Sequence, residues 1–198
     1  MIRPSPPWLK KVLGKRVCLK TFWRDSRGVS AIEFALIAPV LILMYFGFAE
    51  TTQAMMAQRR LSNITAQIGD LVAQTPQTGP SKMTDIFNIG NLIMAPYPTA
   101  GLKMCIYSVV SNAKGEDTVA WVQPNPAGVG MTGCPAKGAP VTDISTGVLA
   151  ANQSIIVSRA TYDYTSATKL VMPTTMTFKR NYYLRPRRSD TVTWVSTL

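Results

Sequence analysis

The feature that most restricts how this chain can fold is the apolar run VSAIEFALIAPVLILMYFGF, residues 29–48, which holds a single charged residue. At about 1.5 Å per residue, a helix of this length spans about 30 Å, the thickness of a bilayer's hydrocarbon core. The apolar region of a cleaved secretory signal is shorter, about 7–15 residues, and a small-residue cleavage site follows it. Here the run is longer and the helical pattern continues beyond it. Residues 29–48 are therefore predicted to form a retained transmembrane helix.

Three features inside this run predict contacts with other helices. A carboxylate such as Glu33 costs about 2.5–3.5 kcal/mol near the centre of a membrane helix, so its presence indicates a role. The alternative is a protonated or interface-exposed carboxyl without a partner. Ala31 and Ala35, four residues apart, would let a second helix approach closely. Pro39 removes a backbone donor and is expected to bend the helix, either as an ordinary kink or as a functional feature.

The residues before the run, 1–28, form a basic leader with eight Lys and Arg against one acid, a net charge of +7. Positive charge beside a membrane helix stays on the cytoplasmic side, so everything after Phe48 is expected to be exported. The leader also suits contact with anionic lipid headgroups of the bilayer. A nucleic-acid-binding arm is the competing explanation for a basic cluster. Because topology already accounts for this charge, no nucleic-acid partner is expected.

The three cysteines divide between the two predicted compartments. Cys18 lies in the cytoplasmic leader, where thiols stay reduced, whereas Cys105 and Cys134 lie in the exported part, where a disulfide can persist. A Cys105–Cys134 disulfide is the prediction, and a pair of buried free thiols is the alternative. The cysteines do not have the spacing of a metal site, and the chain contains no histidine, so no metal or cofactor is expected.

The absence of histidine also argues against catalysis. It removes Ser-His and Cys-His activation and the commonest general base. The exported acids are scattered along the sequence, and the glycines of residues 125–140 lie among prolines without a following helix, so they do not form a phosphate-binding loop. We expect a protein that is not an enzyme.

Beyond the membrane the helix is predicted to continue as an amphipathic segment, residues 49–75. Apolar residues such as Leu61, Ile64 and Ile68 recur at three- and four-residue spacing, and Pro76 ends the pattern. A second helix is expected at residues 82–94, with Ile89 among its apolar set. Two-residue alternation then predicts four strands, and a long Pro- and Gly-rich loop falls between the second and third. The strands are expected at residues 101–112, 118–123, 154–165 and 172–186.

These elements predict an α+β fold in which one N-terminal transmembrane helix continues as a long amphipathic helix packed on an antiparallel sheet of about four strands, a pilin-like arrangement. The expected organisation is a basic cytoplasmic leader at residues 1–28, a transmembrane helix at 29–48, its amphipathic extension at 49–75 and an exported α+β domain at 76–198.

The region from Arg24 to Leu61 resembles the TadE-like family, minor pseudopilins of the bacterial tight-adherence (Flp) pilus machinery. The pattern is a glycine, a small residue, the sequence Glu-Phe-Ala-Leu, a proline and then a glycine followed by an acid. It is carried by Arg27-Gly28, Ala31, Glu33-Phe34-Ala35-Leu36, Pro39, Phe46-Gly47 and Glu50. The resemblance is loose beyond residue 75.

The resemblance implies a single-pass protein of the bacterial inner membrane, with its N-terminus in the cytoplasm and its globular part in the periplasm or in an extracellular filament. It implies that a prepilin peptidase cuts after Gly28 and leaves Val29 as the new N-terminus. The expected partners are other pilins and pseudopilins and the inner-membrane pilus assembly platform. In that setting the Val29 ammonium of one subunit is a natural counter-ion for Glu33 of its neighbour.

Two functions are compatible with these observations. The first is a minor pseudopilin-like assembly protein of the tight-adherence pilus, which acts by protein–protein contacts in the inner membrane and periplasm. The alternative is a permanently membrane-anchored periplasmic adaptor that never enters a filament.

Overall fold

The structure is a computed structural model, which describes residues 28–141 and 149–198. The chain divides into two units, with the boundary between Tyr45 and Phe46, and each unit is described by itself. The described elements confirm the predicted α+β class: two long helices accompany a four-stranded antiparallel sheet. The predicted roles of Cys18 and the rest of residues 1–27 lie outside the described residues.

Helix α3, Val29–Ala73, begins in the first unit and ends in the second. Pro39 lies inside it, and the helix continues through that position. In the second unit one stripe of α3 is buried, because apolar residues recur every three or four positions and so share one face. The stripe includes Ala54, Ala57, Leu61, Ile64, Ile68 and Val72. The helix ends just before Pro76, close to the predicted limit.

Helix α4, Pro80–Met94, starts at a proline, which suits the first turn because the missing N–H has no intrahelical partner there. Its buried side chains are Met83, Ile86, Phe87 and Met94, whereas Ile89, which the prediction placed in the apolar set, is 39% exposed. The prediction for Ile89 was wrong because Gly90 occupies the buried position. A Cβ on Gly90 would lie only 2.9 Å from Met104 Sδ, so the glycine lets α4 approach the sheet closely.

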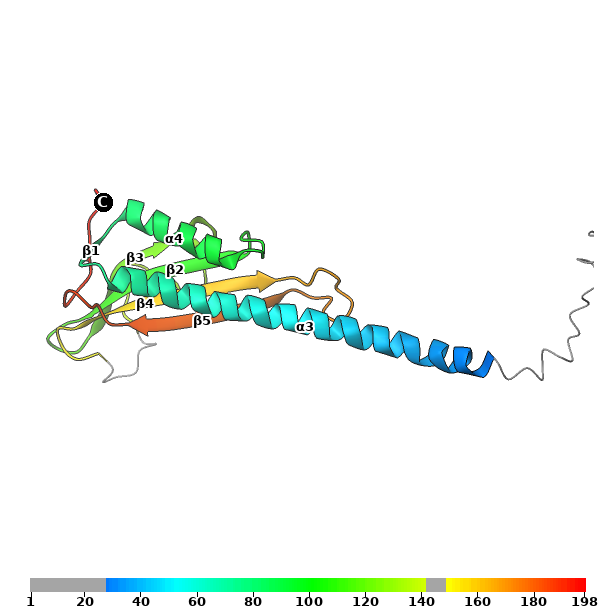
Figure 1. Cartoon of the computed structure of the whole chain (residues 1–198). Coiled ribbons are helices and arrows are strands. Elements are labelled where there is room, and N and C mark those ends of the chain that lie inside the picture. Colours follow the sequence, from blue (N-terminus) through cyan, green and yellow to red (C-terminus); the bar gives the residue numbers. More distant parts are fainter. Residues whose placement is uncertain (1–27, 142–148) are drawn as a thin grey trace, which may run out of the picture. The chain divides into compact units, whose positions relative to one another are not determined.

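The sheet contains β2 (Leu102–Ser111), β3 (Asp117–Pro124), β4 (Ser154–Tyr164) and β5 (Met176–Leu184) in the order β3-β2-β4-β5. Figure 1 shows α3 and α4 lying along this sheet, and core residues from both helices pack on residues such as Met104 and Ile156. Alternate residues of β2 and β4 lie on the other face of the sheet, away from the helices, and pack against Met131 and Leu149 of the long loop. The two central strands are thus buried on both faces.

A second, two-stranded sheet was not predicted. Gln77–Thr78 (β1) pairs in parallel with Thr193–Trp194 (β6). Beside it, the indole Nε1 of Trp121 donates a 2.7 Å hydrogen bond to the Val192 carbonyl. A short 3-10 helix, η2 (Pro126–Gly128), lies in the long loop. The β1–β6 pairing and the Trp121 hydrogen bond fix residues 192–198 against the connection between α3 and α4.

Strand β5 starts four residues later than predicted. Residues 168–172 were expected at its beginning or just before it, but they form part of the connection between β4 and β5. Their backbone N–H groups are not free for a sheet ladder, because those of Leu170, Val171 and Met172 donate to the carboxylate of Glu50. Of the residues that the prediction placed in β5, Met172 donates its N–H to Glu50 and Pro173 has no N–H, so neither can donate to a sheet ladder there.

Candidate functional site

The apolar part of α3 carries all the residues predicted to act inside the membrane. Val29 is the first residue of the helix, and Gly28 directly precedes it. Since successive residues in a helix turn by about 100°, Ala31, Ala35 and Pro39 lie close to one face, whereas Glu33 lies about 160° around the helix axis from both alanines. The helix therefore does not bring Glu33 and the small residues together. It presents two separate faces, one small and one acidic.

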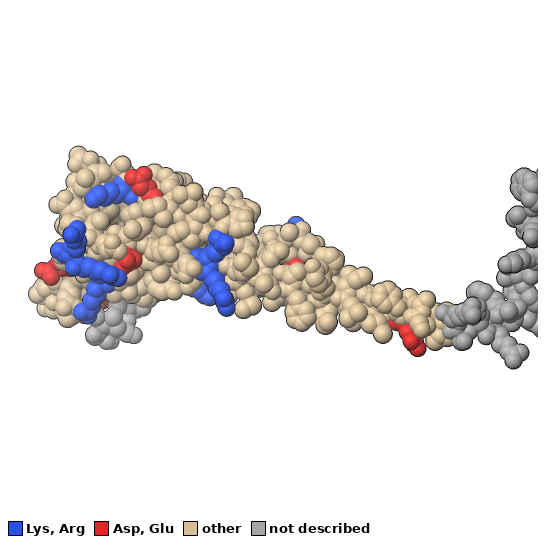
Figure 2. Space-filling view, viewed as in Figure 1, with Lys and Arg blue, Asp and Glu red and all other residues tan. Residues whose placement is uncertain are grey.

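This part of α3 is uncovered by the rest of the described protein. Part of the helix is long and apolar enough to cross a membrane, and no residue of that stretch is buried. Figure 2 shows its surface free of Lys and Arg with one acidic group, as expected for a segment whose single charged residue is Glu33. Among the described residues, none forms a hydrogen bond or an ion pair with the Glu33 carboxylate.

Glu50, two residues beyond the end of the apolar run, has the opposite environment. Its carboxylate is 3% exposed and accepts hydrogen bonds from the connection between β4 and β5. Oε1 accepts from the Thr168 hydroxyl and, at 2.8 Å, from the Leu170 N–H. Oε2 accepts from the N–H groups of Val171 and Met172 at 3.1 and 2.7 Å. Three consecutive backbone donors and one hydroxyl thus surround one carboxylate.

These donors stabilise the charged form of Glu50. The hydrogen bond from Thr168 and those from the three backbone N–H groups together lower the pKa of Glu50 from 4.5 to about 2, against the opposing effect of burial. The four groups that donate to the carboxylate all belong to residues 168–172, and Glu50 is 3% exposed. Glu50 therefore stays ionised at any physiological pH and holds residues 168–172 against α3.

A comparison with known protein families identifies this region. Residues 28–69 match the family model described as TadE-like protein. We refer to residues 28–69 as the TadE-like segment. The resemblance predicted from the sequence is confirmed over that range. No curated protein and no solved structure gives a significant match to the chain.

The TadE-like segment contains Gly28, Val29, Glu33 and the small-residue face, and it also contains Glu50. Sequence reasoning placed Glu50 in the family pattern but gave it no structural role. The available signal was an acid directly after an apolar run, where a charge needs neutralising donors. The sequence does not indicate which groups are those donors, because they lie 118–122 residues away in the chain.

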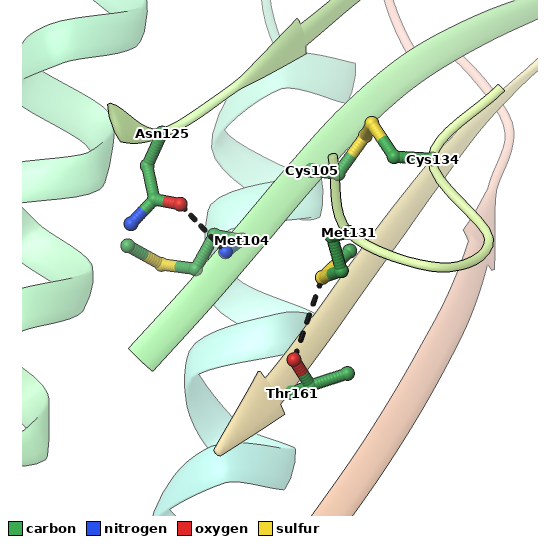
Figure 3. The surroundings of a disulfide bond; sticks show 6 residues. All are labelled: Met104, Cys105, Asn125, Met131, Cys134 and Thr161. Carbon is green, nitrogen blue, oxygen red and sulfur yellow. Dashed lines mark hydrogen bonds between the residues drawn. A yellow bond between two sulfur atoms is a disulfide. The ribbon is translucent and has the colours of Figure 1, made fainter. Parts of the chain in front are cut away.

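Outside the TadE-like segment, the predicted cysteine pair is confirmed. Cys105 of β2 and Cys134 of the long loop are joined by a disulfide with a Cα–Cα distance of 6.0 Å. Figure 3 shows the bridge beside two polar contacts that also hold the loop to the sheet. Asn125 Oδ1 accepts the Met104 N–H at 2.8 Å, and the Thr161 hydroxyl contacts Met131 Sδ at 3.5 Å. The loop is thus fastened across the face of the sheet opposite the helices.

Within residues 28–141 and 149–198, no group of three or more Cys, Asp or Glu side chains is placed to hold a metal ion. The expectation that the protein uses no metal, no cofactor and no catalytic residue stays a prediction. The described features that invite a functional explanation are therefore surfaces: the two faces of the apolar helix and the loop that Glu50 holds.

Proposed function

We propose that the protein is a minor pseudopilin-like assembly protein of the tight-adherence (Flp type IV) pilus, and that it acts by protein–protein contacts rather than by catalysis. The observation that carries the proposal is the TadE-like match at residues 28–69, in a helix that has an uncovered apolar half. In this proposal the protein crosses the bacterial inner membrane once. Its basic leader is cytoplasmic and its sheet domain is periplasmic or enters a filament, as the charge of the leader favours.

The two faces of the apolar helix suit contacts with two different neighbours. Ala31 and Ala35 permit a close approach of helices, whereas Glu33 on the other side needs a cation. Cleavage by a prepilin peptidase after Gly28 would create an ammonium at Val29, and that group on an adjacent pilin-type subunit is the proposed partner of Glu33. Pairing inside lipid would favour one axial stagger between the helices. The assembly platform in the inner membrane is the other proposed partner.

The ion pair gives the proposal a direct test. Glu33→Gln keeps the size and hydrogen bonding of the side chain but removes its charge, so membrane insertion should persist while filament assembly falls. Gly28→Leu should block cleavage and cause a similar loss, because the cation is then missing. Since both changes break one pair, the double variant should be little worse than either single variant. Asp85→Asn, which removes an exposed charge from α4, is the matched control and should assemble normally.

The alternative of a permanently anchored adaptor makes a different prediction for the mature chain. Intact mass of the protein purified from its native membrane would lack residues 1–28 in the pilin-type case and include them in the adaptor case. If Glu33→Gln assembles normally, or if the protein works with its leader attached, the ion-pair mechanism is wrong and the adaptor is favoured.

A further inference from the structure

The connection between β4 and β5, residues 165–175, exposes apolar side chains. Leu170 and Val171 are adjacent and are 52% and 50% exposed. The polar residue before them, Lys169, is also exposed and has a φ of 53°, in the left-handed region that residues other than glycine rarely adopt. Hydrogen bonds from Thr168 and Leu170 to Glu50, on either side of Lys169, hold this conformation. The tip of the loop is thus kept in a shape that turns two apolar side chains outward.

The loop lies against the end of the apolar run. A methyl carbon of Val171 is 3.5 Å from the point where a Cβ on Gly47 would lie. Gly47 belongs to residues 29–48, the segment predicted to be in the membrane, and Glu50 is one turn further along the same helix. The exposed apolar side chains are therefore at the level where α3 is expected to leave the hydrocarbon. The bilayer that α3 is expected to cross is therefore the apolar medium nearest to Leu170 and Val171.

The backbone of the loop is also suited to that medium. An unpaired N–H costs several kcal/mol in lipid, where no water can accept from it, which excludes most loops from the hydrocarbon. Here the three N–H groups of residues 170–172 already donate to Glu50. Leu170 and Val171 can therefore enter the interface without leaving these donors unsatisfied. Lys169 is long enough to keep its ammonium among the phosphate groups while its stem lies in the apolar layer.

We propose that residues 169–172 are a second membrane contact, in which Leu170 and Val171 insert into the interfacial layer of the bilayer that α3 crosses, and that Glu50 holds the loop in the inserting conformation. The proposal rests on the membrane anchoring in the proposed function. It adds a specific consequence, because a membrane helix alone leaves the domain free to tilt, whereas a second contact beside it restrains the domain at the membrane surface.

Depth-dependent quenching tests this contact in the full-length protein. Cys18→Ser removes the free thiol, and single cysteines are then introduced by Val171→Cys, Leu41→Cys or Ala113→Cys and labelled with an environment-sensitive dye. Each protein is reconstituted into phosphatidylglycerol-containing nanodiscs, with or without lipids spin-labelled high on the acyl chain. Ala113 is the matched control, because it lies in the turn between β2 and β3, at the other end of the sheet from the β4–β5 connection.

The expected result is a blue shift and lipid quenching at position 171, strong lipid quenching at position 41 and neither effect at position 113. Adding Glu50→Gln should reduce the effect at position 171 and leave position 41 unchanged. Quenching at 41 but not at 171 overturns the loop contact and leaves the membrane anchor standing. Absence of quenching at both positions removes the anchor and the loop contact together. Protection of 171 from a water-soluble quencher without lipid quenching identifies a protein surface as its partner and also overturns the proposal.

Discussion

Removing the Cys105–Cys134 disulfide should destabilise the sheet domain by an amount that can be worked out from the chain. The two cysteines are 29 residues apart in the sequence. On the chain-entropy model, a cross-link closing a loop of that size stabilises the folded state by about 3.6 kcal/mol at 25 °C. For a domain of this size each kcal/mol corresponds to about 2–4 °C in Tm, so the double variant Cys105→Ala/Cys134→Ala should melt about 7–14 °C lower.

The measurement is thermal unfolding of the full-length protein in detergent, followed by near-ultraviolet circular dichroism. That signal reports aromatic packing in the sheet domain, including the buried Trp121. Two comparisons separate the cross-link from packing. Reduction of the wild-type protein breaks the bond without removing side-chain atoms, whereas the double variant does both. Cys18→Ala is the control, because it removes a cysteine that takes no part in the bridge.

Reduction alone should produce most of the loss in Tm. If the reduced wild-type protein melts within about 2 °C of the oxidised one, which corresponds to 1 kcal/mol or less, the unfolded chain gains no appreciable freedom and the entropy argument fails. If only the double variant is destabilised, packing around the sulfur atoms is the stabilising factor. Both outcomes would leave the geometry of the bridge intact and refute its assigned energetic role.

Three further predictions concern α3 and α4. The folded-state pKa of Glu50 is lowered from 4.5 to about 2, so its contribution to stability is present above pH 4.5 and is lost as the pH falls towards 2. The Tm difference between wild type and Glu50→Gln should therefore be largest near neutrality and vanish near pH 2. A Tm difference that does not change with pH would contradict this prediction. Gly69→Val should destabilise the domain by about 1–3 kcal/mol in a urea titration, because a Cβ at Gly69 would lie 2.9 Å from Ser158 Cβ; an unchanged midpoint would show that α3 can shift. Leu61→Ala, at a fully buried position, should cost about 2–5 kcal/mol in the same titration, whereas Leu92→Ala, at a side chain that is 75% exposed, should change little.

The long elements could be predicted from the sequence because each carries many repeats of its own period. The apolar stripe of α3 repeats over several turns, so its limits were found within about two residues. The disulfide followed from a different kind of information, the compartment of each cysteine, which needs no knowledge of the fold. The resemblance beyond residue 75 is loose and gave little information on the fold there, and the family match ends at residue 69.

What could not be predicted depends on contacts between distant parts of the chain. β1 and β6 are two residues long, too short for any period, and they pair across more than a hundred residues. The late start of β5 reflects Pro173, which has no N–H for a ladder, and the hydrogen bond of the Met172 N–H to Glu50, a distant residue that no local pattern indicates. Ile89 and Gly90 show the same limit inside a helix, since the choice of the buried position depended on Met104 of a strand.

The pairing of β1 with β6 has a consequence for how the protein is made. β1 directly follows α3, yet its partner strand lies at Thr193–Trp194, and the Ser81 N–H donates to the carbonyl of Leu198 at 3.0 Å. During synthesis the ribosome delivers α3 and β1 before the rest of the sheet domain, so β1 has no partner strand until Thr193–Trp194 have emerged. A chain that stops short of residues 192–198 would leave β1 and the start of α4 without these contacts, and incompletely packed chains of this kind are prone to aggregation. The contacts of residues 192–198 are thus the last that the growing chain can form.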